Sequence, residues 1–392
     1  MKRVVFAMLL PLTVVAVFSC AHIEPPVNVP RVENVRIEIR PVRVLVGVAT
    51  RAQPIFVSAA REVAVWSQDA KDVLGSIGID KTPVGFTQTS VTIGNTQWGT
   101  PAVILVPDAD DQIKVGDTVY PGQIALVKRG ESVAAVNFVL MEDYVAGVVT
   151  CEMPSYFERS ALQTQAVAAR TFALWQMKQR RLQVYDVKDD VSDQVYRGLS
   201  GTTAASRLAS ERTRGTVVVY DWQFLPAFFF STCGGYTVGA AYLRGAPVIP
   251  PLSGVKCEYC KASKRYRWAI TISAAEIEQA LAKAGYLSGS LEDIRVTKTI
   301  PGGWVDTVEI VASNGTKQLA GYVLRQVVGT SRLYSTNFIA VRSGANYIFE
   351  GRGYGHGVGL CQYGANGMAS RGFNFVEILE YYYPGASVKR IY

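Results

Sequence analysis

Apolar and polar residues alternate along the first third of the chain, a pattern that is typical of β-strands. Residues rich in glycine, aspartate and asparagine separate these alternating stretches and are suited to turns. The strands predicted by this pattern cover residues 35–39, 44–48, 62–66, 102–106 and 123–128. Residues 34–136 are therefore expected to form a β-rich N-terminal part, in which catalytic residue types do not cluster.

A different pattern starts at residue 137, in the stretch around which the remaining chain is organised. An apolar, strand-like run, with Glu142 and Asp143 at its entry, continues to Glu152-Met153-Pro154, where proline interrupts regular structure. Alanine, leucine and phenylalanine at helical spacing then predict a long buried helix over residues 158–179, capped by Ser155. Glu152 is therefore expected in a bend before this helix, either as a partner of the helix dipole or as a working acid.

The second half of the chain mixes both patterns. Helices are predicted at residues 204–214, 273–285, 362–370 and 375–382, and strands at residues 216–220, 227–230, 267–272, 294–299, 305–311 and 337–341. The first two of these strands are expected to form a hairpin around Asp221-Trp222. The prediction is an α+β fold, with a strand-rich N-terminal region packed on a mixed core at residues 137–392 that contains the long central helix.

The first twenty residues have the features of a targeting segment. Lys2 and Arg3 precede an apolar run that ends at Phe18, and this run is too short to count safely as a membrane span. Residues 17–20 resemble a bacterial lipobox, which predicts lipidation of Cys20, although signal-peptidase cleavage near Ala21 is an alternative. Proline-rich residues 21–33 are then a tether. We expect an exported, membrane-anchored lipoprotein that faces the periplasm or the cell wall.

The composition narrows the range of partners. Hydrophobic residues make up 49% of the chain and charged residues 18%, which indicates a packed globular protein. The formal net charge is +8, but the basic residues are scattered and are not interleaved with aromatic residues in the manner of a nucleic-acid-binding surface. Nucleic acid is therefore excluded as a partner. A mildly basic surface suits an anionic polymer such as the cell wall, or is simply solvated.

Five ordered stretches resemble the motifs of the SpoIID/LytB family. They are EDYVAGVVTCEMP with the following ALQTQAVAARTFAL, SDQVYRG, FFFSTCGGYT, RYRW, and GRGYGHGVGLCQYGANGMASRG. The resemblance implies a protein that cleaves peptidoglycan glycan strands with the glutamate of the Glu-Met-Pro motif, here Glu152, as its acid. It also implies that the motifs converge on one groove. The expected substrate contacts are Gln165, Arg170, Gln194, Tyr196, Ser231, Thr232, Arg352, Tyr354, His356, Gln362 and Tyr363.

The scarcity of histidine independently limits the chemistry. His22 lies in the tether, so His356 is the only histidine in the expected folded part. Ser-His-Asp, Cys-His and His-rich metal mechanisms are therefore excluded. A single carboxyl group suffices for a lytic transglycosylase that forms 1,6-anhydro-muramic acid ends, and such an enzyme requires no cofactor. The alternatives are a non-catalytic amidase enhancer and a lipoprotein that tethers the envelope to peptidoglycan.

Two features of the candidate site raise physical questions. A helix starting near Ser155 would lower the pKa of Glu152, whereas a general acid needs a raised pKa, so burial would have to outweigh the helix dipole. Residues 351–359 carry a glycine at every second position, which we interpret as exposed backbone that an extended polymer can approach closely. His356 lies within this stretch and is predicted to be part of a functional surface.

The cysteines allow two interpretations. Cys233, Cys257, Cys260 and Cys361 all lie in or beside motifs that should converge, and four thiolates would suit a tetrahedral zinc ion. Disulfides or free thiols are the alternative, and disulfides are the default in exported proteins. Cys151 is expected to be a small buried residue. Some family members carry a zinc site of one histidine and two cysteines near residue 190, but Val187 and Asp193 occupy the cysteine positions here, so that site is predicted to be absent.

Overall fold

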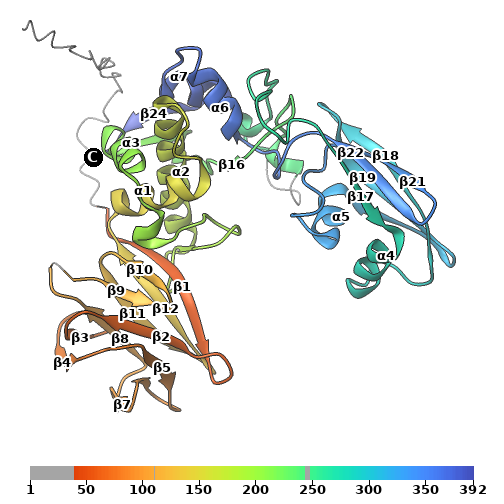
Figure 1. Ribbon diagram of the computed structural model, residues 1–392. Helices are drawn as coiled ribbons and strands as arrows, with labels where there is room; N and C mark the ends of the chain where they lie inside the picture. The colour runs from red at the N-terminus through yellow and green to blue at the C-terminus, as the bar shows by residue number, and fades with distance from the viewer. Residues whose placement is uncertain (1–38, 110, 243–247) are drawn as a thin grey trace, which may run out of the picture.

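The computed structural model describes residues 39–109, 111–242 and 248–392, which form an α+β fold (Figure 1). A β-rich N-terminal lobe is followed by a helical lobe, and a second β-rich lobe is inserted late in the chain. The predicted signal peptide, tether and lipidation site at Cys20 lie outside the described residues, as does all but Ile39 of the strand predicted at residues 35–39. None of the described helices combines the length and the hydropathy needed to cross a lipid bilayer.

The N-terminal lobe consists of two sheets with the strand orders β13-β1-β12-β11-β8-β3-β4 and β10-β9-β2-β5-β6-β7. Inward-facing aliphatic side chains such as Val44, Val65 and Leu105 are fully buried between them. The strands are β1 (Val42–Thr50), β2 (Ile55–Ala59), β3 (Val63–Ser67), β4 (Val73–Ile77), β5 (Thr82–Phe86), β6 (Val91–Ile93), β7 (Thr96–Gln97), β8 (Ala102–Val106), β9 (Ile113–Val115), β10 (Thr118–Tyr120), β11 (Gln123–Arg129), β12 (Ser132–Val139) and β13 (Val187–Lys188). The strands predicted within residues 44–128 are confirmed as β1, β3, β8 and β11.

The helical lobe is built around the long α2, which packs against α1, α3, α6 and α7. Its many alanines are buried, because small side chains let the neighbouring helices approach closely. The helices are α1 (Met141–Glu152), α2 (Arg159–Gln179), α3 (Ala204–Arg212), α6 (Gln362–Ala369) and α7 (Phe375–Tyr382), with short 3₁₀ turns η1 (Gly198–Gly201), η2 (Ala240–Tyr242) and η3 (Pro250–Leu252). The strands are β14 (Thr216–Tyr220), β15 (Gln223–Phe224) and β24 (Ser387–Arg390), which form one sheet, and the parallel pair β16 (Phe229–Phe230) and β23 (Leu360–Cys361).

The inserted lobe leaves the helical lobe after β16 and returns at β23. Its two three-stranded sheets, β17-β22-β21 and β18-β19-β20, enclose a hydrophobic core of their own, which contains Tyr347 and Phe349. Its elements are β17 (Trp268–Ser273), α4 (Ala274–Lys283), β18 (Leu291–Ile300), β19 (Trp304–Ala312), β20 (Gly315–Ala320), α5 (Gly321–Val328), β21 (Phe338–Ser343) and β22 (Asn346–Gly351). The first two lobes instead share a single continuous core.

Most elements of the second half are where the sequence predicts them, and Ser273, the first residue of the helix predicted at residues 273–285, is the N-cap of α4. The predicted hairpin is wrong in its second strand. Asp221 and Trp222 do form a tight turn, with φ values of 48° and 58°, but the turn joins β14 to β15. Residues 229–230 pair instead with β23, far away in the sequence.

The segment before Pro154 also differs from its prediction. Only residues up to Val139 are strand, and α1 occupies Met141–Glu152. Glu142 and Asp143 in the first turn favour a helix start, and burial of the Val148-Val149 pair in the core outweighs the weak helix propensity of valine.

Candidate functional site

Glu152 is the last residue of α1, and its backbone is followed by an extended Met153. The chain then turns through Pro154–Phe157 before α2 begins at Arg159, whose N-cap is Glu158. The predicted cap at Ser155 is wrong, because Ser155 is exposed and lies four residues before the helix starts. Glu152 therefore lies at the C-terminal end of a helix, not at the N-terminal end of one.

This placement changes the electrostatics of the Glu152 carboxyl group. Burial raises its pKa, and this effect exceeds the lowering by the Val195 N–H, which donates a hydrogen bond of 2.8 Å to Oε1. The carbonyl end of α1 carries partial negative charge, which also disfavours the ionised carboxylate. The dipole that acts on Glu152 is therefore that of α1 and not that of the following helix, and it favours acid function instead of opposing it. The carboxyl group can hold a proton at a pH where an exposed glutamate has lost it.

Aromatic side chains after Glu152 connect it to the C-terminal motif. The ring of Phe157 packs edge-to-face on that of Tyr363, with centroids 5.1 Å apart, and Tyr156 packs on Phe157 while remaining 79% exposed. Tyr363 is the second residue of α6, and its amide donates to the carbonyl oxygen of Ser231, 3.0 Å away. The structure therefore brings two predicted contacts, Ser231 and Tyr363, to the segment that follows Glu152.

Gln165 of α2 and Gln362 of α6 also meet, as their motifs predict, because the Gln362 side chain donates to Gln165 Oε1 at 3.3 Å. Both side chains are buried, and Gln165 Nε2 has no hydrogen-bond partner among the described residues. An unpaired buried amide costs about 1–3 kcal/mol, so this donor is suited to a water molecule or a ligand group.

Other predicted substrate contacts are structural. Gln194 accepts a hydrogen bond from the Tyr144 hydroxyl, and Tyr196 donates one to Asn137 at 3.2 Å; all four side chains are fully buried. Thr232 is buried as well, where its hydroxyl lies 2.7 Å from that of Ser263. Gln194 and Tyr196 hold the loop that supplies the Val195 amide, whereas Thr232 joins the segment after β16 to the loop before β17. None of these three predicted contacts faces solvent.

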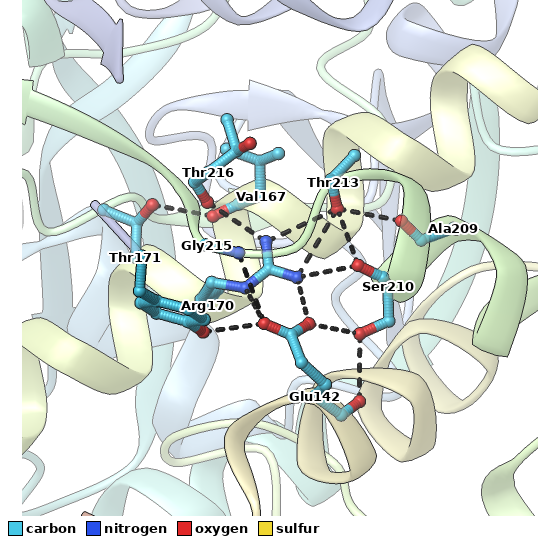
Figure 2. A network of polar contacts seen from close by, with 10 residues as sticks. Glu142, Val167, Arg170, Thr171, Ala209, Ser210, Thr213, Gly215 and Thr216 are labelled. Atoms are coloured by element: carbon cyan, nitrogen blue, oxygen red, sulfur yellow. Dashed lines mark hydrogen bonds and ion pairs between the residues drawn. The ribbon is translucent and has the colours of Figure 1, made fainter. Parts of the chain in front are cut away.

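Arg170 is the predicted substrate contact that the structure contradicts most clearly (Figure 2). Its guanidinium group is completely buried and forms a two-pronged ion pair with Glu142, with contacts of 3.1 Å from Nε and 2.5 Å from an Nη atom. The Nη atom that contacts Glu142 also donates to the Ser210 carbonyl oxygen, and the other Nη atom donates to that of Thr216. The Tyr392 hydroxyl donates a hydrogen bond of 2.6 Å to the Glu142 carboxylate. Arg170 joins α2 to α1, α3 and the C-terminus, so it has no donor directed to a substrate.

His356 also has a different role from the predicted one. Its Nδ1 accepts a hydrogen bond from the Val358 amide, which places the proton on Nε2, 2.9 Å from the Phe229 carbonyl oxygen. Burial lowers the pKa of His356 to about 4, although the bond to Phe229 opposes this effect. The imidazole is therefore neutral at pH 7, and both nitrogens are occupied by the backbone of the β16–β23 region.

The glycines around His356 serve the protein's own packing. A Cβ on Gly359 would lie 2.2 Å from the Phe228 carbonyl oxygen, and one on Gly357 would lie 2.7 Å from the Trp304 ring. Both glycines have positive φ and are buried. The interpretation of this stretch as backbone open to a polymer is therefore wrong for these positions.

Two predicted contacts from the same stretch do remain accessible. Arg352 is exposed, and Tyr354 is 38% exposed. The Tyr354 ring packs edge-to-face on Tyr334, over which the guanidinium group of Arg265 stacks at 3.9 Å from the ring centroid. These side chains lie where the chain crosses between the inserted lobe and the helical lobe.

The loop between α2 and η1 is held by ion pairs at the positions where some relatives have zinc ligands. Asp193 accepts hydrogen bonds from Arg180 and Gln176 at 2.5 and 2.8 Å, and from the Lys188 amide at 2.8 Å. Val187 is buried in β13, which pairs with β1. This loop supplies the Val195 amide that contacts Glu152.

A pocket of about 340 Å³ lies away from Glu152. It is lined by charged residues that include Glu142, Asp143 and Arg207. These acids begin α1, whereas Glu152 ends it, about 15 Å away along the helix. We assign no chemistry to this pocket.

The four cysteines in the motifs do converge. Cys233, Cys257, Cys260 and Cys361 are buried, and their sulfur atoms all lie within 4.8 Å of one another. Cys151 is partly buried and lies apart from this cluster against Gly201, where burial raises the pKa of its thiol.

Several residues of the site were not predicted from the sequence. Val195 acts through its amide, which has no signature in the sequence. Asn366, whose side chain accepts a hydrogen bond from the Glu158 amide at 2.8 Å, lies in a recognised motif but is far from Glu152 in the sequence. Tyr156 could have been selected as an aromatic residue close to the Glu-Met-Pro motif.

Comparison with known proteins agrees with the motifs. The family model described as "Stage II sporulation protein" (SpoIID) matches residues 129–220, which include Glu152 and the Val195 loop. Stage II sporulation protein D of Bacillus subtilis is 37% identical over 293 residues, which are 70% of this chain and 82% of that protein. The chain belongs to the SpoIID family.

Other matches extend this family assignment. The amidase enhancer of Bacillus subtilis is 27% identical over 62% of this chain and 40% of its own length. An uncharacterised protein of Brachyspira hyodysenteriae is 30% identical over 72% of this chain and 76% of its own. A domain of unknown function, DUF8618, matches residues 255–359, so in this SpoIID protein the inserted lobe corresponds to a separately defined domain.

Proposed function

We propose that this SpoIID protein is a lytic transglycosylase that cleaves peptidoglycan glycan strands with Glu152 as its single acid and base. The observation that carries the proposal is the partly buried carboxyl group of Glu152, whose pKa is raised by burial and which accepts a hydrogen bond from the Val195 amide. A carboxyl group with a raised pKa keeps its proton to a higher pH than an exposed glutamate does, as a general acid requires. The Stage II sporulation relatives support a role at the cell wall.

The reaction needs only this one group. Glu152 protonates the glycosidic oxygen that leaves C1 of the muramic acid residue, and the C1–O bond breaks with its electron pair on the leaving oxygen. The carboxylate then accepts the proton of the 6-hydroxyl group of the same sugar while O6 bonds to C1. This step forms a 1,6-anhydro ring and restores the acid without consuming water. The Val195 N–H would stabilise the carboxylate between the two proton transfers.

The surroundings of Glu152 suit a sugar polymer. Tyr156, Phe157 and Tyr363 form a continuous aromatic group directly after the acid, and aromatic rings provide large apolar contacts with a polar edge.

The test is mass spectrometry of glycan strands, with and without stem peptides, after incubation with the purified protein. Products with 1,6-anhydro-muramic acid ends are expected, and Glu152→Gln should slow their formation by about 10²- to 10⁴-fold. Glu158→Gln is the matched control, because it removes an exposed carboxylate six residues away. Intact strands in every sample, or equal cleavage by Glu152→Gln, would contradict the proposal.

The match to an amidase enhancer favours a second candidate, in which the protein stimulates a separate wall amidase without cutting glycan itself. Under this alternative, Glu152→Gln would still increase the rate at which an amidase releases stem peptides. Peptide release and anhydro-sugar formation, measured in the same mixture of protein, amidase and peptidoglycan, separate the two functions.

We further infer that Cys20 carries a lipid that anchors the protein to a membrane, because it follows an apolar segment ending in a lipobox-like sequence. Mass spectrometry of the N-terminal peptide should find an acylated Cys20, and Cys20→Ala should release the protein from membranes. An unmodified N-terminus near Ala21 would show ordinary signal-peptidase cleavage instead.

A further inference from the structure

Four buried cysteines lie where the chain leaves the helical lobe for the inserted lobe and where it returns. Cys233 follows β16, and Cys257 and Cys260 precede β17, so three of them are on the outgoing chain. Cys361 is in β23, on the returning chain, and pairs in register with Phe230 of β16. Each sulfur atom lies within 4.8 Å of the other three.

This arrangement fits one tetrahedral metal ion better than two disulfides. Zinc–sulfur bonds of about 2.3 Å place the four sulfur atoms of a tetrahedral site about 3.8 Å apart. Cys233 and Cys260 have their sulfur atoms 3.4 Å apart, and the other pairs fall within the same small sphere. A disulfide would pair each sulfur with one partner only, whereas here each sulfur has three close neighbours.

Hydrogen-bond donors surround the sulfur atoms. Cys361 Sγ accepts from the backbone amides of Cys233 and Gly364, at 3.2 and 3.3 Å. Cys233 Sγ accepts from the Gly235 amide at 3.4 Å, and Cys257 Sγ lies 3.1 Å from the Tyr382 hydroxyl. Donors of this kind stabilise negative sulfur and orient it, as expected around metal-bound thiolates.

The neighbouring helix is shaped to hold the Cys257–Cys260 loop. A Cβ on Gly364 would lie 1.9 Å from the Tyr382 hydroxyl and 2.9 Å from Cys257 Sγ. A Cβ on Gly367, one turn further along α6, would lie 2.0 Å from the Tyr259 carbonyl oxygen. The two glycines therefore give α6 a flat face on which this loop lies directly.

We propose that Cys233, Cys257, Cys260 and Cys361 bind one structural zinc ion that fastens both chain crossings of the inserted lobe to α6. A closed Cys₄ set leaves no coordination position for substrate, so the ion has a structural and not a catalytic role. It holds the segment that carries Ser231 and the start of α6 that carries Tyr363. The site does not depend on the proposed transglycosylase activity and can be tested without it.

The first test is elemental analysis of the full-length protein and its variants after purification without added metal. About one zinc per chain is expected in the wild type, and Cys260→Ser should retain less than a fifth of it. Cys151→Ser is the matched control and should keep the full amount, because Cys151 lies outside the cluster. Equal zinc content in Cys260→Ser and the wild type, or iron in place of zinc, would overturn the proposal.

A second measurement on the wild type does not require the variants to fold. Alkylation in denaturant and a chelator, without reductant, should modify Cys233, Cys257, Cys260 and Cys361 completely. X-ray absorption should show four sulfur neighbours at about 2.3 Å from zinc. Resistance of these cysteines to alkylation, together with a mass deficit of about 4 Da and no bound metal, would identify two disulfides and overturn the proposal.

Discussion

At the scale of single residues, the Glu152 carboxyl group couples chemistry to stability. Its pKa is raised in the folded protein, so the folded state holds the proton more tightly than the unfolded state does. The stabilisation by this proton is complete below the unfolded pKa of about 4.3 and is lost as the pH rises through the folded pKa. At neutral pH the folded protein therefore keeps an acid in an environment that disfavours its ionised form.

Glu152→Gln should consequently stabilise the protein at neutral pH. The amide is neutral at every pH, and its oxygen can still accept the hydrogen bond of the Val195 amide. Free energies of unfolding from denaturant titrations at pH 4 to 8 should show an advantage for the variant that grows as the pH rises from the unfolded toward the folded pKa and is complete above the folded pKa. Glu158→Gln should show no such trend, and a destabilised Glu152→Gln at pH 7 would contradict the assigned electrostatics.

For His356 we expect the opposite pH dependence of stability. Its pKa of about 4 lies below the usual 6.5, mainly because of burial and in part because of the nearby Arg325 charge. The unfolded state therefore binds the proton more readily, and the stability provided by neutral His356, complete above pH 6.5, is lost as the pH falls toward 4. Each pKa unit corresponds to about 1.4 kcal/mol, so the upper limit is about 3 kcal/mol, which partial solvent exposure reduces.

Nuclear magnetic resonance of the imidazole should therefore show a neutral ring, protonated on Nε2, throughout pH 5–8. His356→Gln should reduce the slope of unfolding free energy against pH between 4 and 6.5. A ring that titrates near 6.5 would contradict the structural role and return His356 to the list of substrate contacts.

At the scale of elements, the Glu142–Arg170 ion pair is the main polar connection between α1 and α2. Burial alone would raise the pKa of Glu142, but Arg170 and the hydroxyl groups of Ser210 and Tyr392 outweigh it and lower the pKa below its usual value. The carboxylate is thus ionised, and the cation has no other carboxylate partner among the described residues. Removing one member leaves a buried charge without its counter-charge.

Arg170→Met should therefore destabilise the protein by about 3–5 kcal/mol, measured by denaturant unfolding. Arg207→Met is the matched control, because Arg207 pairs with Asp143 at 3.5 Å in a largely exposed setting, where loss should cost at most about 1 kcal/mol. The double variant Glu142→Gln/Arg170→Met should be less destabilised than the sum of the single variants. Equal, small losses for Arg170→Met and Arg207→Met would contradict this role.

The sequence predicted an element correctly where the contacts that stabilise it are between residues close together in the chain. The helix α4 was predicted at residues 273–285, where Ser273 and Glu276 form a local capping box, and α2 was predicted from its alanines at helical spacing. Residues 141–152 look strand-like because valine disfavours helices, and only burial against α2 and α3 makes them helical. The pairing of β16 with β23 joins residues about 130 apart, so no local pattern could indicate it.

The same distinction applies to the candidate site. Glu152 was identified from its motif, and the convergence of the four cysteines followed from the order of the motifs. Arg170 was misassigned because its motif reveals neither burial nor the partner Glu142, 28 residues earlier in the chain. Polar residues in a motif can be required for the fold as well as for the substrate, and only their three-dimensional partners distinguish the two roles.

At the scale of the whole molecule, the position of the inserted lobe depends on a few contacts near its base. Trp304 lies in β19 of the lobe but is fully buried in the continuous core of the first two lobes. Its indole N–H donates to the carbonyl oxygen of Tyr236, on the outgoing chain, at 3.0 Å. Gly357 is in contact with this ring, and Gly302 lies against Tyr236. Trp304 is therefore the main hydrophobic anchor between a lobe with its own core and the rest of the chain.

Trp304→Ala should loosen the attachment of the lobe while leaving its interior folded. Truncating a buried tryptophan costs about 3–5 kcal/mol, and here the loss falls on the contact between two cores. Hydrogen exchange should increase at residues 236–238 and 355–358, with little change in β17 and β22. Phe349→Ala, inside the core of the lobe, is the comparison and should increase exchange in β17 and β22 first. If Trp304→Ala instead unfolds the whole chain in one step, the lobe is not a separate cooperative unit, and its core and that of the helical lobe stabilise each other.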